Sequence, residues 1–190
     1  MKKIAILASG SGSNAENIYN YFKNNKQVEV ALIVSNRQDA YVLKRAENLN
    51  IESVVFSKND FETTEKVLDF LRNKNIDFIV LAGFLLKVPA NIINAYPNGI
   101  INIHPALLPK YGGKGMYGDN VHKAVREAGE TESGITIHYV NENYDEGNII
   151  FQAKCPVSKE DTYEDIAKKV HILEYTHFPE VIESVIFSKD

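Results

Sequence analysis

The sequence predicts an α/β protein that is built on one doubly wound, mostly parallel sheet. In the first half of the chain, short apolar runs typical of strands alternate with apolar patterns at helical spacing, which implies right-handed crossovers. The run at residues 78–82 is apolar, as in a parallel strand covered on both faces. A loop of glycines and serines, residues 9–14, separates the first strand from the first helix. We therefore expect a Rossmann-like sheet with helices on both faces.

The first half of the chain carries four predicted strands and the helices between them. The strands are predicted at residues 3–8, 28–34, 53–56 and 78–82. A first helix should follow the glycine loop, because apolar residues recur at helical spacing from Ala15 to Phe22. A second helix should end near Leu49, and a third should span residues 61–73 with Asp60 as its N-cap.

The second half adds a hairpin and a long C-terminal helix. In chain order, its first elements are a short helix after Pro89, a strand that ends at His104, a helix at residues 119–128, and strands at residues 134–140 and 148–156. The last two strands should form an antiparallel hairpin across the loop at residues 141–147. A long helix then begins near Thr162, and Pro179 should kink or interrupt it.

Length and composition bound the class of protein. A chain of 190 residues fits one domain, so we expect a single domain over residues 1–190. A net charge of −4 without a basic run argues against a nucleic-acid partner. The lone Cys155 fits a reducing compartment, and the initial apolar run stops at Ala8, too short for a signal peptide. No run reaches membrane-spanning length. We expect a soluble, cytoplasmic protein whose oligomeric state the sequence leaves open.

Two polar residues mark the end of the strand that precedes Pro105. Asn102 and His104 lie two residues apart among apolar neighbours, so alternation along a strand sends both side chains to the same face. Pro105 disfavours the helical region for His104 and holds it extended at the strand tip. Two interpretations are open: a polar pair satisfied within the core, or two hydrogen-bonding groups that point into a cleft.

The glycine loop after the first strand is a candidate anion site. Its backbone N–H groups and the helix dipole would point at an anion. Residues 10–15 also fit the dinucleotide pattern G-x-G-x-x-G/A. The second predicted strand ends in Ser35-Asn36-Arg37 instead of an acidic residue, which excludes the usual NAD contact and leaves only an NADP alternative through Arg37. The serines favour a terminal phosphate, although a tight turn would also need small residues.

These features should meet at one edge of the sheet. The glycine loop, Gly83, Asn102 and His104 all follow carboxyl ends of strands, where open parallel sheets bind ligands. Asp145, in the predicted hairpin loop, is the candidate acidic partner of His104. A charged imidazole beside an amide would stabilise an oxyanion, which suits acyl or formyl transfer. Because the chain lacks a G-x-S-x-G motif, we favour direct attack by a substrate amine.

The remaining histidines and the second glycine-rich segment do not point to one particular function. Histidines at positions 122, 138, 171 and 177 show no H-x-H or H-E-x-x-H spacing, so we expect no metal site. His138 alternates within a strand, as a packed or hydrogen-bonded residue would. The glycine-rich segment at residues 111–118 is either a lid or a solvated connection.

Four segments together resemble the folate-dependent formyltransferases, and in particular the group that acts on phosphoribosylglycinamide. They are the glycine loop at residues 10–14, Leu81-Ala82-Gly83-Phe84, Asn102-Ile103-His104-Pro105 with its continuation to Tyr111, and Asp145-Glu146-Gly147. The resemblance covers essentially the whole chain. It implies formyl transfer from 10-formyltetrahydrofolate, the co-substrate, to the amine of 5'-phosphoribosylglycinamide in purine biosynthesis, with small-molecule substrates as the only partners.

The resemblance also implies roles for individual residues. Asn102 and His104 would stabilise the oxyanion, while Asp145 orients or charges His104 and helps proton transfer. The implied substrate-binding residues are Gly12, Ser13, Asn14 and Glu174, and the implied folate-binding residues are Leu85, Leu86, Lys87, Val88, Asn102 and Tyr144. Residues 1–100 would then form the phosphate-binding half, and residues 101–190 the folate and catalytic half.

Two departures from the family pattern concern the glutamate tail of the folate. Leu86 and Thr64 stand near positions where many relatives carry arginine, which leaves the contacts to that tail open but not the chemistry. Three alternatives also stay open: a formyltetrahydrofolate deformylase or another folate-dependent formyltransferase, a nucleotide- or folate-binding module without catalysis, and an NADP-dependent oxidoreductase.

Overall fold

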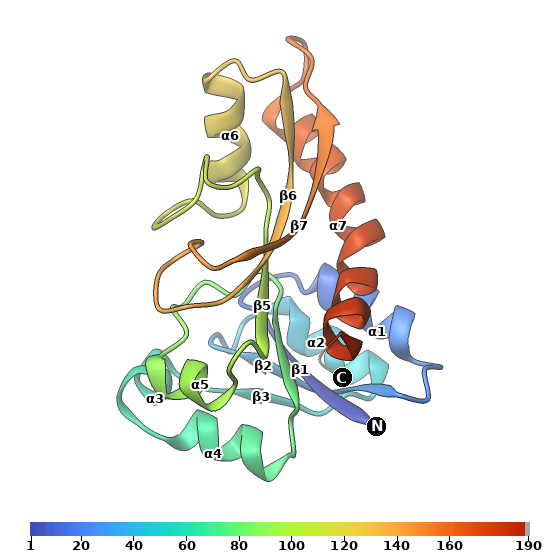
Figure 1. Ribbon diagram of the computed structural model, residues 1–190, viewed down its shortest axis with the longest axis vertical. Helices are drawn as coiled ribbons and strands as arrows, with labels where there is room; N and C mark the ends of the chain where they lie inside the picture. Colours follow the sequence, from blue (N-terminus) through green and yellow to red (C-terminus); the bar gives the residue numbers. More distant parts are fainter. Residues whose placement is uncertain (189–190) are drawn as a thin grey trace.

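A computed structural model, which describes residues 1–188, shows a seven-stranded sheet in the order β3-β2-β1-β4-β5-β6-β7 (Figure 1). The strands are β1 (Lys2–Leu7), β2 (Val28–Ser35), β3 (Ser53–Val55), β4 (Phe78–Leu81), β5 (Ile100–His104), β6 (Glu132–Tyr139) and β7 (Ile149–Pro156). Strands β1 to β5 pair in parallel, whereas β5–β6 and β6–β7 pair antiparallel. The predicted mostly parallel sheet with a C-terminal hairpin is confirmed.

Helices cover both faces of the sheet. They are α1 (Ser13–Phe22), α2 (Tyr41–Leu49), α3 (Lys58–Thr63), α4 (Lys66–Asn73), α5 (Ala90–Ala95), α6 (Asp119–Glu127) and α7 (Tyr163–Phe187). The sheet separates two hydrophobic cores, and strand β1 contributes side chains to both. Ile4 and Ile6 belong to the core with α1, α2, α6 and α7, while Ala5 and Leu7 belong to the core with α3, α4 and α5. Strand order reverses between β1 and β4, so the crevice beyond their carboxyl ends is the expected ligand position. None of the helices described in residues 1–188 is long and apolar enough to cross a membrane.

The third predicted helix is wrong in its start and in its continuity. Ser57, not Asp60, is the N-cap of α3: its hydroxyl accepts from Asp60 N at 3.1 Å, while the Asp60 carboxylate accepts from Ser57 N at 2.9 Å. Asp60 is therefore the third helical residue of a capping box. Thr64 is extended and its hydroxyl donates to Asp60 O at 2.8 Å, which ends α3 before α4 begins.

The sequence predicted that Pro179 would kink or interrupt the C-terminal helix. The predicted interruption is wrong. Helix α7 runs unbroken through the buried Pro179. A proline has no N–H for the carbonyl four residues earlier, here that of Tyr175. The Tyr175 carbonyl instead accepts a hydrogen bond from Asn17 Nδ2 of α1 at 2.9 Å. A neighbouring helix thus satisfies the group that the proline leaves unpaired.

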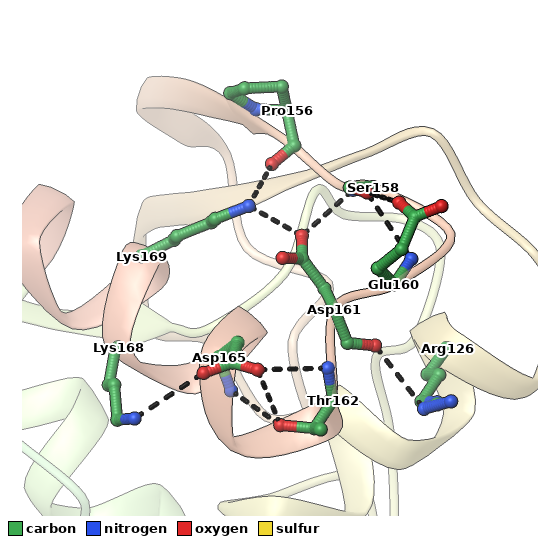
Figure 2. A network of polar contacts seen from close by, with 9 residues as sticks. All are labelled: Arg126, Pro156, Ser158, Glu160, Asp161, Thr162, Asp165, Lys168 and Lys169. Atoms are coloured by element: carbon green, nitrogen blue, oxygen red, sulfur yellow. Dashed lines mark hydrogen bonds and ion pairs between the residues drawn. The ribbon is translucent and has the colours of Figure 1, made fainter.

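A polar network fixes where α7 begins (Figure 2). Thr162 Oγ1 accepts from Asp165 N at 3.2 Å, and Asp165 Oδ2 accepts from Thr162 N at 3.1 Å, so the helix starts with a capping box. The Asp161 carboxylate pairs with Lys169, the seventh residue of α7. The main-chain carbonyl of Asp161 accepts from Arg126 of α6 at 3.2 Å. The network ties α7 to α6, and α7 then runs beside α1 (Figure 1).

Candidate functional site

The tip of β5 carries Asn102 and His104, as predicted, and its pairing with β6 determines what they meet. The antiparallel register places Asn102 opposite His138 and His104 opposite Thr136. Asn102 Nδ2 lies 3.1 Å from His138 Nε2, and His104 Nδ1 lies 3.6 Å from Asp145 Oδ2. Both side chains therefore converge on Asp145, His104 directly and Asn102 through His138.

His104 is a buried imidazole, 3% exposed, whose two nitrogens face different partners. Nε2 donates to the main-chain carbonyl of Tyr111 at 2.7 Å, so the neutral ring carries its proton there. The lone pair of Nδ1 then faces Asp145. Burial lowers the pKa of His104, and the Asp145 carboxylate and the Tyr111 carbonyl only partly oppose it. His104 is accordingly a neutral base in the free protein at neutral pH, and Asp145 does not charge it there.

Asp145 lies in the β6–β7 loop in the left-handed region, with φ of 56°. Its Oδ2 accepts from Gly113 N at 2.9 Å, and its Oδ1 lies 3.6 Å from His138 Nε2. Burial raises the pKa of the Asp145 carboxyl, but His138, the charge interaction with His104 and the Gly113 N–H outweigh it, so the net pKa is lowered. Asp145 is therefore ionised.

The glycine-rich segment packs directly against the acidic loop. A Cβ added at Gly112 would lie 2.6 Å from Leu108 Cδ2 and 3.3 Å from Asp145 Cβ, so a larger residue there would displace the end of the Leu108 side chain and crowd Asp145. Together with the bonds from Tyr111 O to His104 and from Gly113 N to Asp145, this packing makes the segment part of the site.

Residues of the glycine loop and the first turn of α1 also meet a partner from the C-terminal helix. Gly12 is the N-cap of α1 with φ of 71°, and a Cβ there would lie 2.3 Å from Val42 Cγ2. Asn14 Nδ2 donates to Glu174 Oε2 at 2.9 Å, which unites two regions that the sequence separates by 160 positions. Because Gly12 has no side chain to cap the helix, the N–H groups of the first turn are left for another acceptor.

His171 joins this second cluster and is a residue that the sequence reasoning missed. Its Nδ1 lies 2.7 Å from Glu174 Oε2, and its Nε2 lies 3.4 Å from Ser13 Oγ. Glu174 itself is buried, at 8% exposed. The signal in the sequence was the spacing of three residues along α7, which places His171 and Glu174 on one face.

Four of the six predicted folate residues, at positions 85–88, occupy the loop after β4, while Asn102 lies on β5 and Tyr144 in the β6–β7 loop. Ser9, which follows β1, connects the loop after β4 to the loop after β2. Its hydroxyl accepts from Leu85 N at 2.9 Å and donates to Asn36 Oδ1 at 2.5 Å. A cavity of about 230 Å³ beside it is lined by Glu62, Lys87, Val88, Pro89, Ala90 and Glu142. Val88 is buried, Leu86 packs against the core that includes β4, and Leu85 and Tyr144 are each 42% exposed. The structure brings Lys87 and Val88 to the β6–β7 loop through Glu142.

Arg37, the residue of the NADP alternative, and the possible metal ligands lie as follows. Arg37 forms a surface ion pair with Asp39, with Nη2 at 2.7 Å from Oδ2. In the part of the chain that the structure describes, no group of three or more His, Cys, Asp or Glu is placed to hold a metal ion.

Comparisons with known proteins agree with this geometry. The sequence matches the formyl transferase family over residues 2–182. It is 38% identical over 191 residues to the phosphoribosylglycinamide formyltransferase of Bacillus subtilis (strain 168), covering 98% of this chain and 95% of the relative. It is 40% identical over 190 residues to the chloroplastic phosphoribosylglycinamide formyltransferase of Arabidopsis thaliana, covering 97% of this chain but 65% of the plant protein. The chain thus spans just under two thirds of that relative's length.

Solved structures give the same result for the fold. The phosphoribosylglycinamide formyltransferase from Bacillus halodurans superposes with a TM-score of 0.88 at 32% identity, covering 100% of this chain and 97% of that chain. The enzyme from Streptococcus pneumoniae TIGR4 gives 0.86 at 34% identity, covering 98% and 99%. The chain therefore belongs to the formyl transferase family.

Proposed function

We propose that this protein transfers the formyl group of 10-formyltetrahydrofolate to the amine of 5'-phosphoribosylglycinamide. The observation that carries the proposal is the convergence of Asn102, His104 and Asp145 at the carboxyl edge of the sheet that also carries the glycine loop of α1. The family and the names of the relatives support both the reaction and the substrate.

The cluster around the N-terminus of α1 suits the phosphate and ribose of the substrate. Backbone N–H groups at Gly12, Ser13 and Asn14 would hold the phosphate at the positive end of the helix dipole. Glu174, fixed by Asn14 and His171, is an acceptor suited to hydroxyl groups of the sugar.

The loop after β4 suits the folate. Lys87 and Val88 line a cavity together with Glu142 of the β6–β7 loop. The neighbouring Leu85 and Leu86 would extend the first wall of a folate site, and Tyr144 would extend the second. The bond from Leu85 N to Ser9 Oγ fixes the first wall against the end of β1. Under this proposal, residues 1–100 hold the phosphate and residues 101–190 supply the catalytic groups.

The reaction joins the substrate amine to the formyl carbon and breaks the bond from that carbon to N10 of the folate. Attack creates an oxyanion and a cationic amine nitrogen. Asn102 donates an N–H to the oxyanion. His104, neutral in the free protein, takes the proton of the amine nitrogen at Nδ1 and becomes an imidazolium that Asp145 stabilises at 3.6 Å. The proton then passes to N10 as the bond to N10 breaks.

The test is a turnover assay with both substrates and with each one alone. Purified protein should convert 10-formyltetrahydrofolate to tetrahydrofolate only when phosphoribosylglycinamide is present, and the formylated product should form in equal amount. Equal turnover with water as the acceptor would identify a deformylase and refute the substrate assignment. Binding of both ligands without product would instead identify a non-catalytic module.

An oxidoreductase is disfavoured by the surroundings of Arg37. The NADP alternative needs this guanidinium for a 2'-phosphate, but both of its nitrogen contacts go to Asp39, at 3.0 and 2.7 Å. A fluorescence titration with NADPH should show no saturable binding.

A further inference from the structure

One buried imidazole beside the catalytic groups has no role in the proposed reaction. His138 is 2% exposed and lies on β6 directly opposite Asn102. Its Nε2 lies 3.1 Å from Asn102 Nδ2 and 3.6 Å from Asp145 Oδ1. It therefore lies between the amide and the carboxylate.

The proton on His138 is placed by its other nitrogen. Nδ1 lies 2.9 Å from the carbonyl oxygen of Tyr139, which can only accept a hydrogen bond. The neutral ring therefore carries its hydrogen on Nδ1 and presents a lone pair at Nε2. Asn102 Nδ2, which can only donate, satisfies this lone pair.

The tautomer of His138 has a consequence for the neighbouring amide. The two ends of an Asn amide have nearly the same shape, so packing alone does not determine which end is the donor. With the amide reversed, Asn102 Oδ1 would face the lone pair of Nε2 and the bond would be lost. The NH₂ group has two hydrogens, so one bonds His138 and the second is left for another acceptor.

We propose that His138 is a positioning residue that sets the orientation of the Asn102 amide, so that its NH₂ group and not its oxygen serves the reacting carbonyl. This inference rests on the proposed function, because it assigns Asn102 as the oxyanion donor. His138 itself need not touch the substrate.

Two substitutions test the roles of the two His138 nitrogens one at a time. In His138→Gln the side-chain oxygen can take the place of Nε2 and accept from Asn102. In His138→Asn the amide can take the place of Nδ1 and donate to Tyr139, but nothing reaches Asn102. We expect His138→Gln to keep kcat within about threefold of wild type, and His138→Asn to lower kcat by at least about tenfold with little change in either KM. His177→Asn, which changes an imidazole that packs at a tilt against the Phe151 ring, is the control and should leave kcat unchanged.

A double-mutant cycle with Asn102→Ala tests the route of the effect. If His138 acts through Asn102, His138→Asn should cost much less in the Asn102→Ala background than in the wild type. Equal losses in both backgrounds, or a more active Asn than Gln variant, would overturn the inference while the proposed function stands. If one of the two variants does not fold, kcat of the other is still compared with that of wild type. A kcat outside the range expected for either folded variant would also overturn the inference. A wild type without glycinamide-dependent turnover, or a fully active Asn102→Ala variant, would overturn the proposed function and the inference with it.

Discussion

The main-chain carbonyl of Tyr111 accepts a hydrogen bond from His104 Nε2 at 2.7 Å, and this bond determines which nitrogen of the neutral His104 ring is left without a hydrogen. Tyr111 is held in the left-handed region, with φ of 57°, and its hydroxyl donates to Glu130 Oε1 at 2.9 Å. The side chain of Tyr111 thus fixes a carbonyl that in turn orients the imidazole of His104.

Removing the Tyr111 hydroxyl should therefore slow the reaction. Tyr111→Phe loses the bond to Glu130 but keeps the ring and the carbonyl, so we expect kcat to fall by about threefold, as for one ordinary hydrogen bond. Lys110→Met is the control, because Lys110 bonds the same Glu130 oxygen at 2.8 Å on the surface without contacting His104. Steady-state kinetics with both substrates saturating provide the measurement. Equal rates for Tyr111→Phe and wild type would contradict the positioning role.

The pH dependence should reveal the interaction of Asp145 with His104. The carboxylate raises the pKa of His104 against the larger lowering by burial, so Asp145→Asn should lower that pKa further. Because His104 must be neutral to accept a proton, the acid limb of kcat/KM should shift to lower pH in this variant, while kcat falls about a hundredfold. Profiles between about pH 5 and pH 8 test this. An acid limb that is unmoved or shifted upward would show that Asp145 does not act on His104.

The cluster of Asn14, His171 and Glu174 should affect substrate binding more than turnover. Glu174→Gln keeps the shape of the side chain but removes the charge that faces His171 and Asn14. We expect KM for phosphoribosylglycinamide to rise about tenfold with kcat nearly unchanged. Glu183→Gln is a matched control on the same helix, since Glu183 bonds Tyr21 and Asn25 away from the site. A fall in kcat without a change in KM would contradict the assignment.

The hydrogen bond at Pro179 makes a prediction about stability. Asn17→Ala leaves the Tyr175 carbonyl without its partner, and should lower the free energy of unfolding by about 1 kcal/mol. In a Pro179→Ala background, the new N–H of residue 179 can bond that carbonyl, so the same Asn17→Ala change should cost much less. Urea unfolding of the four proteins in the cycle gives the coupling. Strict additivity would show that the Asn17 amide does not compensate for the proline.

Several parts of the site could be predicted because they follow from local rules. Alternation and Pro105 sufficed for Asn102 and His104, and the geometry of parallel sheets places strand ends at one edge. Asp145 could be paired with His104 because the hairpin signal put its loop next to the last strands. In the fold, the same local signals predicted every strand end to within two residues, apart from the start of β5, for which no residue was predicted.

Other parts could not be predicted because they depend on pairing between distant segments. His138 meets Asn102 only through the β5–β6 register, which neither strand's own sequence determines. The Tyr111 partner of His104 is a main-chain oxygen, which no side-chain pattern reveals. Asp60 and Pro179 were interpreted from local preference alone, whereas Ser57 and Asn17 supplied the hydrogen bonds that determine the outcome.

The most direct test of the catalytic assignment is kcat of His104→Gln with both substrates saturating. The glutamine amide can still donate to Tyr111 O in place of Nε2, but the variant has no base in place of Nδ1. We expect kcat to fall by about a hundredfold or more, with both ligands still bound and the unfolding midpoint close to that of wild type. A kcat within about twofold of wild type would contradict the role of His104 and, with it, the proposed mechanism.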